Sequence, residues 1–219
     1  HYKADEIIQG MYWENGKGCA VGCTVHSWEH SSFETELGIP RILARILDTI
    51  FEELPNELAK EFPLQFLSAI NVGADLLKVW NYFAIWLLTD AEYGILQHVK
   101  NKKVVQDIAD AYADDITTSV SVERWKELRD AAAYYAANTV YAADYAAYSA
   151  YYAAANAAYY AYYADVAYYA AAAAAVGAAD ATNAAANAAA YSADAGADKK
   201  QAWYIAASKK LIEFLTETL

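Results

Sequence analysis

The chain has 219 residues, of which 58% are hydrophobic, and its 16 basic against 28 acidic residues give a net charge of −12. That hydrophobic fraction can build a sizeable core and excludes a largely disordered chain. The negative charge argues against a protein whose main task is to bind DNA or RNA, because phosphate binding requires a cationic surface. With 3 prolines and 9 glycines, the chain also lacks the frequent turn residues of a β-sandwich.

The cysteine content bears on the cellular compartment. Cys19 and Cys23 are the only cysteines, and no signal peptide is visible. Two cysteines in a chain of this size do not make a disulfide scaffold, so we expect a reducing, cytoplasmic environment. The uncharged stretch 145–164 is long enough to cross a bilayer, but it holds only Ala, Tyr, Ser and Asn between Asp144 and Asp165. We therefore expect no association with a membrane.

Helical spacing of apolar residues recurs through residues 1–130, which have an ordinary globular composition. The run 40–51 carries isoleucines on one face, and Pro40 suits a first helical turn, where its missing N–H costs nothing. A second helix is predicted to begin with Asp75 as its N-cap, to run to Leu88 and to end near Thr89–Asp90. That helix is apolar nearly all round, so we expect it in the centre of the core.

Weaker patterns predict further elements in the same region. Shorter helices are expected at 56–61, 63–70, 92–99 and 102–113, and no alternating strand pattern is found. The fold class predicted for the whole chain is therefore all-α. We expect a mixed helical region at 1–130, packed as one unit on an Ala/Tyr-rich helical bundle at 131–219.

The composition changes abruptly near Asp130. Residues 131–195 hold 35 alanines and 14 tyrosines, and neither Lys nor Arg occurs between Arg129 and Lys199. Alanine has the highest helix propensity, so a helical segment is predicted. A single helix from 122 to 176 would be roughly 80 Å long, far more than a compact domain of this size spans. We therefore expect breaks, near Asn138–Thr139, Asn156 or Gly177, and a turn at 195–197 with Asp198 capping the last helix.

Tyrosines in this segment recur at steps of three, four and seven, which places them in one stripe on a helix. The stripe consists of Tyr134, Tyr141, Tyr145, Tyr148, Tyr152, Tyr159 and Tyr163. Aromatic rings could stack on nucleotide bases, but such sites combine them with Lys or Arg, which are missing here. We therefore interpret the stripe as structural, with rings buried between helices.

The most unusual local stretch, 15–30, contains the spacing C-x3-C-x2-H-x3-H. Its members Cys19, Cys23, His26 and His30 are our candidate metal ligands, because Cys and His together are typical of zinc sites. On one regular helix, the first and last of them would lie about 16 Å apart along the axis. They could reach one ion only if the chain bends at its glycines, and the spacing is shorter than that of an ordinary zinc finger.

Two other interpretations of this stretch stay open. Cys19 could be a nucleophile, exposed by the preceding glycines and activated by a helix N-terminus. His26 or His30 would then be the base, and Glu34 or Glu36 would orient it. Alternatively, the cysteines and glycines are small residues at a contact between helices, which requires no site. We favour this last interpretation and expect no cofactor, with zinc as the one candidate.

The remaining motifs argue against common enzyme classes. Nucleotide-binding glycine motifs, the H-E-x-x-H zinc motif and the G-x-S-x-G nucleophile motif do not occur. Four acidic residues share one predicted helix and resemble a metal-binding ridge: Asp107, Asp110, Asp114 and Asp115. Such ridges are usually solvated surface, and we interpret this one in that way.

The N-terminal half also resembles known sequences. The run KGCAVGCTVH at 17–26, followed by ETELGIP at 34–40, is similar to a group of uncharacterised bacterial and phage proteins that end in a similar Ala-rich tail. The Ala-rich half more loosely resembles immunity proteins of the Imm5-like type. Neither resemblance implies a catalytic residue.

Taken together, these features favour a non-enzymatic interaction or inhibitory protein, of the immunity or phage counter-defence kind. Its acidic surface is expected to bind a partner protein of basic character and not nucleic acid. The alternative is a small enzyme or zinc-site protein that uses Cys19, Cys23, His26 and His30. Of these, Cys19 and His26, together with Glu36, are the candidate catalytic residues.

Overall fold

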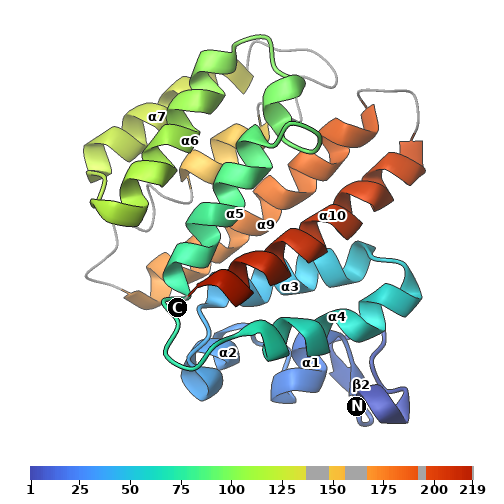
Figure 1. The fold of residues 1–219 in the computed structure, drawn as a ribbon. Coiled ribbons are helices and arrows are strands. Elements are labelled where there is room, and N and C mark those ends of the chain that lie inside the picture. Colours follow the sequence, from blue (N-terminus) through green and yellow to red (C-terminus); the bar gives the residue numbers. More distant parts are fainter. Residues whose placement is uncertain (137–147, 156–166, 192–195, 219) are drawn as a thin grey trace.

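Figure 1 shows the computed structural model of the chain, which describes residues 1–136, 148–155, 167–191 and 196–218. The predicted all-α fold is confirmed, because helices dominate these residues and the only sheet among them is a two-stranded hairpin. The short elements are η1 (Tyr2–Ala4), β1 (Trp13–Glu14), β2 (Lys17–Gly18), α1 (Ala20–Val25), α2 (Ser31–Leu37) and η2 (Ile95–Gln97). The longer helices are α3 (Arg41–Glu53), α4 (Asn56–Ala69), α5 (Leu77–Thr89), α6 (Lys102–Thr117), α7 (Val122–Ala136), α9 (Ala167–Tyr191) and α10 (Gly196–Glu217).

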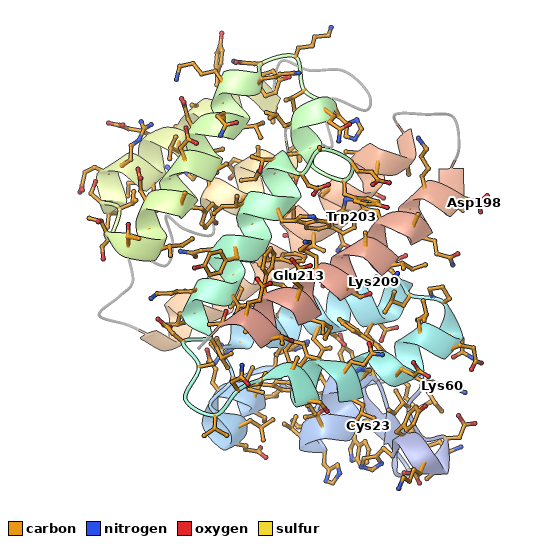
Figure 2. All side chains as sticks on the ribbon, viewed as in Figure 1. Cys23, Lys60, Asp198, Trp203, Lys209 and Glu213 are labelled. Carbon is orange, nitrogen blue, oxygen red and sulfur yellow. The ribbon has the colours of Figure 1, made fainter. Side chains whose placement is uncertain are left out.

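Helices α9 and α10, from the Ala/Tyr-rich region, pack against helices of the mixed helical region. Helix α9 packs along α3, and α10 packs on α9, α4 and α5. Figure 1 shows α5, α6 and α7 on one side of this pair and α1, α2 and α4 on the other. One cluster of buried side chains runs through the described residues from Ile7 to Leu215, across both predicted regions. In Figure 2, Trp203 of α10 points into this interior, where its ring lies 5.6 Å from that of Trp86 on α5.

The contact between α3 and α9 follows from the sizes of their side chains. Helix α3 buries a face of isoleucine and leucine, including Ile42, Ile46 and Ile50. Helix α9 buries alanines at steps of three and four residues, among them Ala181 and Ala185. Alanine lets the two backbones approach closely, so the large side chains of α3 fill the space between them.

The main predicted helices are confirmed. Helix α3 matches the predicted run 40–51, α5 matches 76–88, and α6 includes 102–113. The predicted N-cap of α5 is wrong by one residue. Leu76 precedes the helix, and Asp75 instead forms an ion pair with Lys78.

Several local predictions are wrong. The helices expected at 56–61 and 63–70 are one helix, α4, with Pro63 inside it. A proline in a helix interior costs about 3 kcal/mol, but Phe62 and Phe66 on either side are fully buried, and burying each contributes about 1.5–3 kcal/mol. The helix expected at 92–99 is only the short turn η2, and the hairpin of β1 and β2 was not expected.

Two predicted features of the Ala-rich half are also corrected. Helix α9 continues through Gly177 without a break, whereas the other predicted breaks, at Asn138–Thr139 and Asn156, lie outside the described residues. Helix α10 begins at Gly196, so Asp198 lies in its first turn instead of capping it. An acidic side chain in that turn still stabilises the helix through its dipole.

The three described members of the tyrosine stripe do not form the buried face that we expected. Tyr134 is 77% exposed, Tyr148 is 45% exposed and Tyr152 is half-buried. The helical residues 148–155 bury Ser149 and alanines instead, and the Ser149 hydroxyl donates to the carbonyl of Ala181 over 2.9 Å. Small side chains therefore make this contact, because they allow closer packing than tyrosine does. The stripe members Tyr141, Tyr145, Tyr159 and Tyr163 lie outside the described residues.

The described helices were expected not to cross a membrane. No helix in the described part of the chain combines the length and the apolar character that a bilayer crossing requires. The stretch 145–164 falls only in part within that region.

Candidate functional site

The N-terminal hairpin and α1 place the two cysteines in the protein interior. Cys19 is the N-cap of α1 and is 1% exposed, and its Sγ accepts a hydrogen bond from the backbone N–H of Gly22. Cys23 lies one turn later, and its thiol donates to the carbonyl of Gly18 over 3.3 Å. Figure 2 shows Cys23 below α4, at the end of the molecule formed by the first residues of the chain.

Two glycines make this arrangement possible. A Cβ atom on Gly18 or on Gly22 would overlap the backbone carbonyl of Tyr12. The segment before the hairpin therefore lies directly against the start of α1. The favoured interpretation placed Cys19, Ala20, Gly22 and Cys23 at a contact between two helices. Gly22 contacts the bend at Tyr12 and not a helix, whereas α1 as a whole packs on α3.

His26 belongs to a different part of the surface. It ends α1 in the left-handed conformation, with a φ of 50°, and its ring stacks on that of Trp13 at 4.6 Å. A hydrogen bond of 3.0 Å joins its Nε2 atom to Nε2 of His1, whose Nδ1 donates to Glu6. The predicted partnership of His26 with Cys19 is not formed among these contacts.

His30 instead leads to a group of polar side chains that extends from the buried Cys19 to the exposed Glu52. His30 is 5% exposed, and its Nε2 donates to Oδ2 of Asp48 on α3 over 3.0 Å. The Sγ atom of Cys19 and one oxygen each of Asp48 and Glu52 lie within 4.8 Å of one another. We call Cys19, His30, Asp48 and Glu52 the thiol–carboxylate cluster.

The surroundings of this cluster determine its charge. Burial, and secondarily the negative charge of Asp48, raises the pKa of the Cys19 thiol to about 12. Burial also raises the pKa of Glu52, although the backbone N–H of Gly10 donates to its Oε2 over 2.7 Å and opposes that shift. At neutral pH, the metal-free cluster therefore contains a protonated thiol, which is a poor nucleophile.

The two glutamates proposed to orient a catalytic histidine have other surroundings. Glu34 forms an ion pair of 3.1 Å with Arg41 and accepts a hydrogen bond from the backbone N–H of the same residue. Glu36 lies exposed on α2. The three catalytic candidates, Cys19, His26 and Glu36, therefore lie in different environments and do not form one site.

Asp48 and Glu52 were missed by the sequence analysis. They lie four residues apart on α3, and side chains at that spacing share one face of a helix. The prediction of a helix at 40–51 depends on its apolar residues. Asp48 is a polar residue within that run, and Glu52 directly follows it in α3. The tertiary contact that brings Cys19 to this face has no sequence signature.

The predicted acidic ridge on α6 has ordinary partners. Asp107 forms an ion pair with Lys103, and Asp110 accepts a hydrogen bond from Gln106. Asp115 accepts hydrogen bonds from Asn81 and from the backbone of Val120. Asp110 and Asp114 are exposed, as expected for solvated surface, whereas Asp115 is half-buried and makes structural hydrogen bonds.

A second feature is a series of exposed apolar side chains that runs along the sequence from the C-terminal half of α4 to the first residue of α5. Four large side chains within 14 residues of sequence are exposed, and Val72 has no protection at all. We call these residues the α4 surface: Leu64, Leu67, Val72 and Leu77. Glu57 and Glu61 are exposed on the same helix, so carboxylates border the apolar side chains.

Comparison with protein-family models, curated protein sequences and solved structures finds no match to this chain.

Proposed function

We propose that this chain is a non-enzymatic protein that binds and inhibits a partner protein of basic character, and that the α4 surface is part of its binding site. The observation that supports this proposal is the exposure of Leu64, Leu67, Val72 and Leu77 close together in the chain. Single exposed apolar residues are normal, whereas a group of them bordered by polar residues is typical of protein–protein interfaces.

Charge supports a basic partner. The chain carries a net charge of −12, and residues 1–61 alone contain 11 acidic against 5 basic residues. Glu57 and Glu61 next to the apolar side chains would pair with Lys or Arg at the rim of an interface. The electrostatic field of this negative charge speeds the encounter with a cationic partner and makes binding sensitive to salt. We include an inhibitory role, of the immunity or phage counter-defence kind, in this proposal. Only the resemblance of the sequence supports that role.

The competing proposal, an enzyme that uses Cys19 as its nucleophile, has less support. Its thiol is buried and its pKa is raised, whereas an activated cysteine has a lowered pKa and access to substrate. His26, the base proposed for it, contacts Trp13 and His1 instead.

The first test is a photo-crosslinking experiment. A photoreactive amino acid replaces Leu67 in the full chain, the protein is exposed to an extract of its source cells, and the crosslinked product is identified by mass spectrometry. The partner is then purified, and its binding to the parent chain is measured at two salt concentrations. We expect one partner that binds in a 1:1 complex and more weakly at high salt.

Matched variants then locate the site. Glu57→Lys with Glu61→Lys changes the charge next to the α4 surface, and Glu123→Lys with Glu127→Lys makes the same change on α7, at the other end of the molecule in Figure 1. The first pair should weaken binding at least tenfold more than the second. Equal effects of the two pairs, or a partner whose binding survives Leu64→Gln with Leu67→Gln, would contradict the proposed interface.

A further inference from the structure

The thiol–carboxylate cluster contains a carboxylate oxygen that lacks a hydrogen bond of good geometry. The Oδ2 atom of Asp48 accepts the hydrogen bond of His30, whereas its Oδ1 atom is buried and accepts no hydrogen bond of good geometry among the described residues, although the Cys19 thiol interacts with this carboxylate as a weak donor. An unsatisfied buried oxygen of this kind is costly and calls for an explanation. The Sγ of Cys19 and an oxygen of Glu52 lie within 4.8 Å of an oxygen of this carboxylate.

We propose that Cys19, Asp48 and Glu52 bind one zinc ion, with His30 as the residue that positions Asp48. This set shares Cys19 and His30 with the ligands expected from the sequence, but it replaces Cys23 and His26 with two carboxylates of α3. The proposal does not depend on the function proposed above, because none of these residues belongs to the α4 surface.

The donor set suits this metal. Zinc accepts thiolate sulfur at about 2.3 Å and carboxylate oxygen at about 2.0–2.2 Å, with tetrahedral geometry. Ligand atoms around such an ion are about 3.4–3.6 Å apart, so a group whose members lie within 4.8 Å needs only a small contraction. Calcium and magnesium prefer oxygen ligands alone, so the thiol favours zinc over either.

Each of the two carboxylates already accepts a hydrogen bond at one of its oxygen atoms. His30 binds Oδ2 of Asp48, and the backbone N–H of Gly10 binds Oε2 of Glu52. These contacts resemble the outer hydrogen bonds that orient the ligands of known metal sites. Glu52 is exposed, which gives the ion access from solvent and leaves room for a water molecule as the fourth ligand. On binding, Cys19 exchanges its S–H bond for an S–Zn bond, and the proton is released to solvent.

The experiment titrates the full chain with Co²⁺ and then with Zn²⁺. Cobalt bound by a thiolate gives an intense sulfur-to-metal absorption band, so the spectrum reports the ligand directly. We expect one Co²⁺ per chain, a sulfur-to-cobalt band, and loss of that band when one equivalent of Zn²⁺ is added.

The two cysteines provide a matched pair of variants. Cys19→Ser should abolish the band, whereas Cys23→Ser, also at a buried thiol of α1, should keep the band and the affinity. Glu52→Gln changes an exposed residue and should weaken binding without affecting the fold. His30→Gln should keep the band but weaken binding about 10–100-fold, as expected for a positioning residue.

Circular dichroism and thermal melts of the metal-free variants check that each one is folded. The proposal would be overturned if the parent chain with Co²⁺ gave no sulfur-to-cobalt absorption band. It would also be overturned by a band that survives Cys19→Ser, or by an affinity that Glu52→Gln leaves unchanged.

Discussion

The hydroxyl group of Tyr112 donates a hydrogen bond of 2.6 Å to the backbone carbonyl of Ala153. The same oxygen accepts a hydrogen bond of 3.2 Å from the indole N–H of Trp80. Tyr112 is fully buried on α6, Trp80 belongs to α5, and Ala153 lies in the Ala-rich half of the chain. One phenol group thus connects the mixed helical region to the Ala/Tyr-rich region.

This connection predicts the effect of Tyr112→Phe. The variant keeps the ring but leaves the carbonyl of Ala153 and the N–H of Trp80 without their partner in a buried environment. The free energy of unfolding should fall by about 1–3 kcal/mol, which for a chain of this size lowers the melting temperature by about 2–4 °C per kcal/mol. Thermal and urea unfolding of the variant measure the change. Tyr12→Phe, at an exposed tyrosine, is the matched control and should unfold like the parent.

The sequence predicted those parts of the fold in which local pattern and tertiary packing agree. The apolar face of α3 and the apolar surface of α5 determine both the helix and its burial. The predicted break at Pro63 was wrong because the local cost of a proline was considered without the burial of Phe62 and Phe66, which favours one continuous helix. Tyr148 misled the prediction for the opposite reason. Large aromatic side chains were assumed to be buried, whereas the alanines beside them allow the closer contact.

The candidate site was predictable only in part. Cys19 and His30 stand out in the sequence, and both belong to the thiol–carboxylate cluster. Their predicted companions were chosen by proximity in the sequence, which His26 shows to be a poor guide, since its side chain faces Trp13. Asp48 and Glu52 join the cluster through the packing of α1 on α3, a contact that no local pattern encodes.

The close contact at Gly22 predicts a large effect of Gly22→Ala. The added methyl group would overlap the carbonyl of Tyr12, so the segment before the hairpin would have to move. Overpacking of this kind costs about 1–3 kcal/mol. Gly16→Ala is the comparison, because Gly16 has free space around it and only a left-handed φ of 80°, which should cost about 1 kcal/mol. A smaller loss of stability for Gly22→Ala than for Gly16→Ala would contradict the described packing.

The burial of both thiols predicts slow chemical modification. Iodoacetamide can reach Cys19 only when the surrounding structure opens, because its side chain is 1% exposed. We expect both cysteines of the folded protein to react far more slowly at neutral pH than those of the protein in urea, as measured by mass spectrometry over time. Rapid and selective labelling of Cys19 in the folded protein would instead support the enzyme that we consider less well supported.

The half-buried Asp180 on α9 predicts a dependence of stability on pH. Burial raises the pKa of its carboxyl group, although the nearby Arg45 opposes the shift. The folded state therefore binds the proton of Asp180 more tightly than the unfolded state does. Its contribution to stability is fully present below the ordinary pKa of aspartate and is lost as the pH rises through the raised value.

Asp180→Asn removes this pH dependence, because asparagine resembles the protonated acid at every pH and so avoids the cost of burying a charged carboxylate at pH 7. The variant should therefore have a higher free energy of unfolding than the parent at pH 7, and the two should converge below the ordinary pKa of aspartate. Urea unfolding at a series of pH values measures the difference. Asp110→Asn, at an exposed position of α6, serves as the control and should give no gain at pH 7. If Asp180→Asn is instead less stable than the parent at pH 7, attraction to Arg45 outweighs the cost of burial, and the direction inferred for the pKa of Asp180 is wrong.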